Sequence, residues 1–155
     1  VMAIFAYALI ADSAIAATST GTLDVTASVA ASCRVTSTAN VVFGAYDPTD
    51  PADNTVGAGN FKFRCVKGTA FTMHITRTNS MTGVPVADSL AYTIYSDAGR
   101  TALWASAAAA PPAGITTPAP DNTEVTANIY GKIAALQNVA VGSYTETPVT
   151  VSVNY

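Results

Sequence analysis

Residues 60–76 of this 155-residue chain, NFKFRCVKGTAFTMHIT, carry the pattern that decides its fold. In both halves of this stretch apolar and polar side chains alternate, which is the period-two pattern of half-buried β-strands. We predict two strands, at 60–66 and 70–76, separated by a turn. The side chains predicted to face inward are Phe61, Phe63, Cys65, Phe71, Met73 and Ile75.

Short strand-like runs recur along the chain between clusters of Gly, Pro, Asn and Asp, and helical periodicity is absent. The further predicted strands span 33–36, 41–44, 90–95, 103–105, 124–130, 132–135 and 144–154. Residues 47–54 form a turn-rich loop, and the Ala/Pro stretch 107–120 is expected to be an exposed connection. Eight or nine short antiparallel strands predict an all-β, immunoglobulin-like β-sandwich.

Composition supports one β-rich domain and argues against nucleic acid as a partner. Hydrophobic residues make up 50% of the chain and charged residues 11%, while the formal net charge is −3. The seven Lys and Arg residues are scattered along the sequence, so the sequence predicts no basic face that would attract phosphates.

The first sixteen residues resemble the end of a secretory signal peptide. An apolar run is followed by Ala14-Ile15-Ala16, the small-x-small pattern at which signal peptidase cuts, and we predict cleavage before Ala17. The run is too short to span a bilayer of roughly 30 Å, so no membrane anchor is expected. The basic region of a complete signal peptide is missing, and a retained N-terminal strand is the alternative.

The segment 19–29 alternates again. It places Leu23, Val25, Ala27 and Val29 on one side and polar residues on the other. A strand near the start of a chain needs a sheet to join. If the sheet belongs to another subunit, the segment is a donor strand that links a polymer; if the sheet is its own, the protein is self-complete.

The C-terminal segment 147–155 alternates as well, with Val149, Val151, Val153 and Tyr155 on one face. Because this strand ends with the chain, we expect no later strand to cover its flank. An apolar face and a row of backbone N–H and C=O groups would then stay open, and such an edge invites strand addition.

Cys33 and Cys65 are the two cysteines of the chain. In an exported protein an even pair most simply forms one disulfide. Closing this loop would stabilise the fold by roughly 3 to 4 kcal/mol on the chain-entropy estimate. A zinc site is disfavoured, because two thiols and the distant His74 do not supply four ligands.

Three acidic residues, Asp47, Asp50 and Asp53, are spaced every third position and could suggest calcium. The intervening prolines and the lack of a bidentate Glu favour a turn-rich loop instead. We therefore expect no metal site and no cofactor.

Aromatic residues and the histidine offer two further candidate sites. Tyr92, Tyr95 and Trp104 could form a sugar-binding platform, but core and cross-strand packing is the expected role. His74 falls on the polar face of its strand, which favours a solvated side chain over a catalytic base. With one His and no Gly-x-Ser-x-Gly motif, no nucleophile has a credible base, and we expect no enzyme activity.

Two motifs point to a known family. Residues 92–104, YTIYSDAGRTALW, resemble the signature of the spore coat protein U domain, and Ile129–Ile133 followed by Gly142-Ser143-Tyr144 resembles its closing half. The resemblance runs from about Gly21 to Tyr155 and includes both cysteines. Gly142 is also the fourteenth residue from the end, similar to the glycine of chaperone–usher pilins. Tyr155 is the last residue rather than the penultimate one, so the terminal aromatic matches in part.

The family includes the major pilins of archaic, Csu-type chaperone–usher pili. The resemblance implies an incomplete immunoglobulin-like sandwich that is completed by donor-strand exchange. It also implies export through the periplasm, a periplasmic chaperone, an outer-membrane usher, and a homopolymer of identical subunits in an extracellular pilus for attachment and biofilm formation.

These expectations divide the chain into a signal-peptide remnant at 1–16, a donor strand at 17–30 and a pilin domain at 31–155. The alternative function is a self-complete secreted or coat-type binding module, such as a carbohydrate or surface adhesin. A tip adhesin would carry an extra receptor domain, so the sequence favours a shaft subunit.

Overall fold

The computed structural model describes residues 17–155, so the predicted signal peptide lies outside the described residues. That part of the chain contains no helix, and therefore none long and apolar enough to cross a membrane. It contains nine strands: β1 Cys33–Val42, β2 Ala58–Cys65, β3 Thr72–Thr76, β4 Ser80–Val84, β5 Ser89–Ala91, β6 Thr93–Tyr95, β7 Val125–Lys132, β8 Ser143–Thr145 and β9 Thr150–Asn154.

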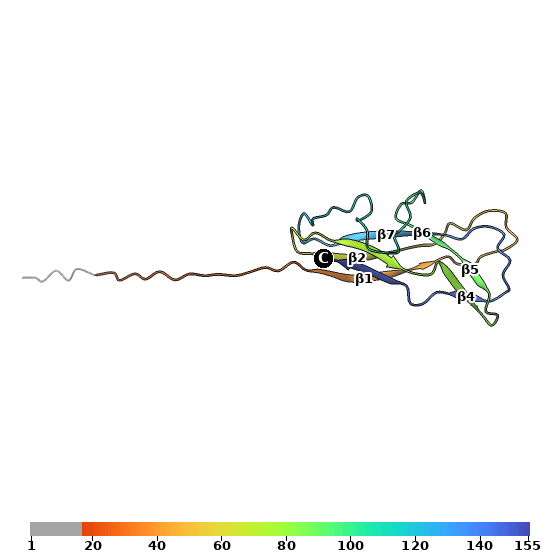
Figure 1. Ribbon diagram of the computed structural model, residues 1–155, viewed down its shortest axis with the longest axis horizontal. Helices are drawn as coiled ribbons and strands as arrows, with labels where there is room; N and C mark the ends of the chain where they lie inside the picture. Colours follow the sequence, from red (N-terminus) through yellow and green to blue (C-terminus); the bar gives the residue numbers. More distant parts are fainter. Residues whose placement is uncertain (1–16) are drawn as a thin grey trace, which may run out of the picture.

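All strand pairs are antiparallel, and they form three sheets (Figure 1). The largest has the order β1-β2-β7-β6, a two-stranded sheet joins β3 to β9, and a three-stranded sheet has the order β5-β4-β8. The predicted all-β, immunoglobulin-like sandwich is confirmed.

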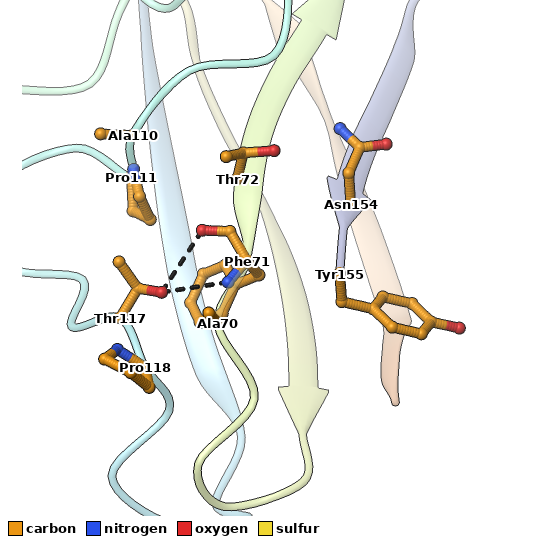
Figure 2. A pocket seen from close by; sticks show the side chains of 9 residues that line it. All are labelled: Ala70, Phe71, Thr72, Ala110, Pro111, Thr117, Pro118, Asn154 and Tyr155. Carbon is orange, nitrogen blue, oxygen red and sulfur yellow. Dashed lines mark hydrogen bonds between the residues drawn. The ribbon is translucent and has the colours of Figure 1, made fainter. Parts of the chain in front are cut away.

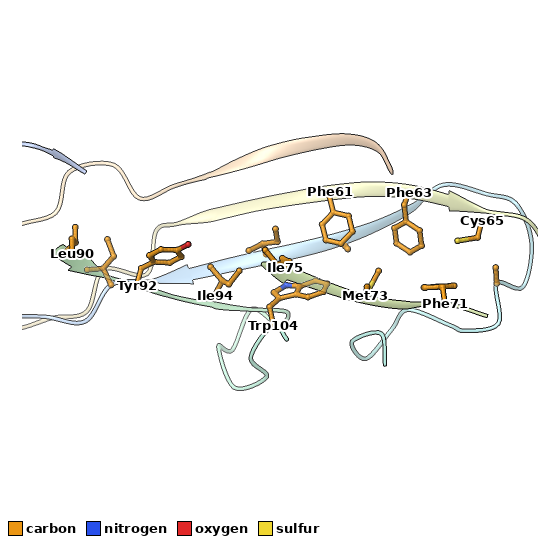
Figure 3. Packing of buried hydrophobic residues seen from close by; sticks show 14 residues of the cluster. Phe61, Phe63, Cys65, Phe71, Met73, Ile75, Leu90, Tyr92, Ile94 and Trp104 are labelled. Carbon is orange, nitrogen blue, oxygen red and sulfur yellow. The ribbon is translucent and has the colours of Figure 1, made fainter. Parts of the chain in front are cut away.

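The core lies between the large sheet and β3, as Figure 3 shows. Phe61 and Phe63 of β2 point toward Met73 and Phe71, and the ring centroids of Phe63 and Phe71 are 5.4 Å apart. All six side chains predicted to face inward from residues 60–76 are buried. Full burial of each large apolar side chain contributes about 1.5 to 3 kcal/mol, so this pair of strands supplies much of the stabilisation.

The predicted disulfide between Cys33 and Cys65 is present. The two cysteines are directly opposite each other, where the first residue of β1 meets the last residue of β2. The covalent bond therefore ties β1 to the core at the point where the N-terminal segment leaves the body.

Several predicted boundaries were wrong. The strands predicted at 33–36 and 41–44 are joined in one strand, β1, which ends at Val42. The strand predicted at 132–135 is not separate, because β7 continues through Gly131 to Lys132 and Ile133 forms only an isolated bridge to Asn54. At Gly131 an added Cβ would lie 2.4 Å from the Phe43 ring. In the sequence, Gly131 resembled a break between two strands. In the structure it lies within β7, where the Phe43 ring packs on the backbone and leaves no room for a side chain.

Other differences concern whole elements. Strand β4 was missed, because its sequence SMTGV does not alternate clearly. The predicted strand 103–105 is reduced to a single bridge between Leu103 and Tyr95. The predicted strand 144–154 is divided into β8 and β9 around Pro148, and the segment 17–32 forms no strand within its own chain.

Candidate functional site: an exposed tail and an open strand edge

Residues 17–31, called the tail below, extend away from the body in Figure 1. The apolar side chains of the tail are exposed, with exposed fractions of 81% for Leu23, 88% for Val25 and 81% for Val29, and Ala27 is exposed as well. Along the described chain, the first backbone hydrogen bond to the body is at Ser32, whose carbonyl accepts from the Val66 N–H at 2.8 Å. The alternating segment is thus available to another chain.

Strand β9 uses one of its two edges. It pairs with β3, and within residues 17–155 no strand is hydrogen-bonded along its other edge. We call this other edge the acceptor edge. The directions of the backbone groups along β3 and β9 follow from the hydrogen bonds of Met73 and Ile75, which lie on the side of β3 away from β9.

Met73 donates to the Ala109 carbonyl at 3.0 Å, and Ile75 donates to the Ala105 carbonyl at 3.0 Å. Both residues therefore turn their peptide groups away from β9. Because successive residues of a strand point their peptide groups to opposite edges, the alternate residues of β3 bond to β9. Their partners include Ser152, which is opposite His74.

By the same alternation, Val151 and Val153 direct their N–H and C=O groups to the acceptor edge. Their side chains point inward, because Val151 is opposite Ile75 and Val153 is opposite Met73, and both valines pack against the core while staying half-buried. The predicted edge residues Val149 and Tyr155 flank β9 and are 42% and 63% exposed. The edge therefore offers unpaired peptide groups beside apolar side chains.

Strand β1 lies beside β9 without belonging to its sheet. Since Ser32 bonds to Val66, the next residue, Cys33, turns its peptide group away from β2, and so does Val35. The half-buried Val35 packs on the core. A strand placed between β1 and β9 would thus meet peptide groups on both sides.

Glu146 is a structural residue that the sequence did not single out. It stands between β8 and β9, and its carboxylate accepts hydrogen bonds from the backbone N–H groups of Thr78 and Ser80. Burial raises the pKa of Glu146, but the hydrogen bonds from Thr78, Tyr92 and Ser80 outweigh burial and hold the pKa below its ordinary value. The carboxylate fixes the chain just before the acceptor edge begins.

A second opening, of about 570 Å³, lies between β3 and the Ala/Pro stretch (Figure 2). Its lining residues are Ala70, Phe71, Thr72, Ala110, Pro111, Thr117, Pro118, Asn154 and Tyr155. The Thr117 hydroxyl is occupied by the backbone of Phe71, and the Tyr155 ring points away from Phe71. The lining contains no acid, base or thiol that could perform chemistry.

The acidic residues of the turn-rich loop do not converge. Asp47 accepts hydrogen bonds from Thr49, which hold the pKa of Asp47 below its usual value. Asp50 caps the Ala52 N–H, and Asp53 forms an ion pair with Lys132 at 3.0 Å. Within residues 17–155 no three His, Cys, Asp or Glu side chains are arranged to hold a metal ion.

The histidine and the aromatic residues have packing roles. His74 lies on the outer face of β3, with its Nδ1 3.3 Å from the Asn154 amide. Tyr92 and Trp104 are buried in the core, and the Trp104 indole N–H donates to the Asn128 carbonyl at 2.9 Å. The sugar-platform alternative is therefore wrong for Tyr92 and Trp104, while Tyr95 is half-buried.

No curated protein matches the chain. A similar solved structure is the crystal structure of the CsuC–CsuE chaperone–tip adhesion subunit pre-assembly complex from the archaic chaperone–usher Csu pili of Acinetobacter baumannii. The match has 18% sequence identity and a TM-score of 0.48, and covers 82% of this chain and 40% of that chain. The chain thus spans less than half the length of that matched protein.

The family comparison is more extensive. The model of the Spore Coat Protein U domain matches residues 19–152, which include most of the tail, both cysteines, the segment 92–104 and most of β9. This range agrees with the resemblance read from the sequence. The chain belongs to the Spore Coat Protein U domain family.

Proposed function

We propose that the protein is a structural subunit of an extracellular pilus that polymerises by donor-strand exchange. The tail of one copy would lie between β1 and β9 of the next copy. The observation that carries this proposal is the coexistence, in one chain, of an exposed segment with alternating apolar residues and a strand edge with unpaired peptide groups.

The two partners match chemically. The tail presents Leu23, Val25, Ala27 and Val29 on one face, and the acceptor edge has apolar side chains of its own. Burying the four tail side chains contributes roughly 5 to 8 kcal/mol before the entropy of ordering the tail is subtracted. Backbone hydrogen bonds along the edge add orientation and slow release, as in other cases of strand addition.

Self-pairing is the alternative that would make the protein a self-complete binding module. It requires the tail to dock in its own domain, and the exposure of Val25 gives no support to that arrangement. A subunit with an unpaired apolar edge is prone to aggregate before assembly. This hazard supports the periplasmic chaperone, the outer-membrane usher and the route through the periplasm that the family resemblance implies.

The proposal is tested by moving the tail. We would compare the mature protein with a variant that lacks residues 18–29 and with a variant in which these residues follow Tyr155 through a short Gly/Ser linker. The mature protein should form linear polymers. The deletion variant should remain an incomplete sandwich that binds a peptide of residues 18–29. The fused variant should be a monomer with a higher Tm than the deletion variant.

A matched control carries the same fusion with Val25→Asp, which should lose the gain in Tm because a charge would enter the core. A mature protein that is a stable monomer, with a Tm that does not change when residues 18–29 are removed, would contradict the proposal.

A further inference from the structure

The fold gathers basic residues that the sequence leaves scattered. Arg34 is directly opposite Arg64 across β1 and β2, both are exposed, and Lys67 follows β2 within three residues of Arg64. Together with Lys62, these are four of the seven Lys and Arg residues in the chain. We call Arg34, Arg64 and Lys67 the root patch, because they surround the disulfide from which the tail departs.

Acidic neighbours only partly balance the root patch. Glu124 lies 3.5 Å from Lys62 and 3.8 Å from Arg64. Hydrogen bonds from Thr123 lower the pKa of Asp121 most, and the charge of Lys67 lowers it further. Four cations thus face two carboxylates, and like charges directly opposite on neighbouring strands are unfavourable. The patch retains positive charge for a further partner.

The opposite end of β1 is acidic. Strand β1 has ten residues, or about 33 Å at roughly 3.3 Å per residue, and the loop that follows it contains Asp47 and Asp50. Their oxygens are held by Thr49 and Ala52, and within residues 17–155 neither carboxylate has a cation at ion-pair distance, unlike Asp53. We call Asp47 and Asp50 the acidic loop.

The connection between the tail and β1 is short, so insertion of the tail brings the bodies of two copies close together. Only residues 30–32 separate Val29 from Cys33. These four Cα steps span at most about 14 Å. If Val29 is held by the acceptor edge of another copy, the root patch must therefore lie against the body of that copy, at one end of β9 or the other.

Charge distinguishes the two ends. The chain ends on the side from which the tail departs (Figure 1), so β9 runs toward the root patch of its own copy. A tail parallel to β9 would bring two root patches together, which like charges disfavour. A tail antiparallel to β9 brings the incoming root patch beyond Thr150, to the end where Val42 closes β1 and the acidic loop begins.

We propose that the root patch of one copy docks on the acidic loop of the copy that holds its tail. The contact is head-to-tail and repeats along the fibre, which is the geometry of an open filament. Complementary charge at such a contact sets orientation more than affinity. This inference rests on the proposed function, and adds a contact between bodies to the contact made by the tail.

Cysteine cross-linking in assembled fibres tests the inference. In the full chain, Asp50→Cys and Lys67→Cys would be combined, the fibres treated with a short bis-maleimide, and the products separated under denaturing conditions. We expect a ladder of covalent multimers from the double variant and no ladder from either single variant. The native disulfide does not react, so cross-links report the added thiols.

Charge variants supply the matched control. Adding Arg34→Glu to the double cysteine variant should weaken the ladder several-fold, and adding Asp47→Lys as well should restore it, which a contact without charge recognition would not do. Fibres that form normally but give no ladder, a ladder insensitive to Arg34→Glu, or cross-linked dimers from Lys67→Cys alone would each overturn the inference. Failure of the unmodified protein to form fibres at all would instead overturn the proposed function.

Discussion

Val151 of β9 lies directly opposite Ile75 of β3, with its side chain on the core and its peptide group on the edge that no described strand covers. Ile75 is fully buried, whereas Val151 remains half-buried. The same residue thus packs its side chain on the core and presents unpaired backbone groups at the open edge. That asymmetry is the physical basis of the proposed assembly.

Replacing Val25 with Asp should block polymer growth while leaving the body folded, because the Val25 side chain is exposed in its own copy, whereas Asp at this position would bury an unpaired charge in the next copy. The cost of such a burial is several kcal/mol. Electron microscopy of secreted material and the yield of folded subunit would measure the two effects. Thr26→Asp, on the other face of the tail, is the control, and normal fibres from the Val25→Asp variant would argue against the donor assignment.

Replacing Val151 with Ala should weaken binding of a peptide of residues 18–29 to the tail-deleted protein. Removing two methyl groups from an apolar contact costs roughly 1.6 kcal/mol, or about tenfold in Kd. Isothermal titration calorimetry would give the ratio. Ser152→Ala, whose side chain faces outward, should bind like the unmodified protein, and equal affinities for all three proteins would count against the acceptor edge.

Loss of the disulfide should destabilise the body. Replacing both Cys33 and Cys65 with Ala removes the link between β1 and β2 and should lower the free energy of unfolding by roughly 3 to 4 kcal/mol. Urea unfolding of the tail-fused monomer would measure it without interference from polymerisation. A change below about 1 kcal/mol would mean that the bond contributes little beyond the hydrogen bonds of the strand pair.

Acid should loosen the segment that precedes β9. The folded pKa of Glu146 lies below its unfolded value, so its contribution to stability is present above the unfolded pKa and is lost as pH falls through the folded pKa. Glu146→Gln should be less stable than the parent at pH 7, and the difference should shrink at pH 3. Urea midpoints at the two pH values would show this. A difference that stays constant with pH would exclude the carboxylate charge as its source.

An alanine at position 131 should strain the body. Its Cβ would lie 2.4 Å from the Phe43 ring, so either the ring or β7 must shift. Overpacking of this kind costs typically 1 to 3 kcal/mol. Thermal unfolding of the Gly131→Ala variant would measure the loss, and Gly21→Ala, where an added Cβ meets nothing within 4 Å, is the control.

The sequence was most informative where one face of a strand is buried and the other is exposed to solvent. The alternation of Phe61 and Phe63 with Lys62 predicted β2 and its inward face, because burial on one side leaves a direct mark on the order of residues. The sequence of strand β4 shows no such alternation, so β4 was not predicted. Gly131 resembled a break between strands, although it lies inside β7.

Features that depend on register could not be predicted. Arg34 lies opposite Arg64 because of the register between β1 and β2, and this register brings the basic residues of the root patch together. The role of Glu146 likewise requires the turn at Thr78 and Ser80 to lie next to it, although nearly seventy positions separate them in sequence. Long-range alignment of this kind is set by the packed core, which single-residue patterns do not encode.

The most direct measurement is a density map of the assembled fibre that resolves side chains. The account predicts that residues 23–29 of one copy run antiparallel to β9 of the next, with Val25 buried beside Val151. A map in which the tail folds back onto its own body, or in which the acceptor edge stays empty, would contradict it.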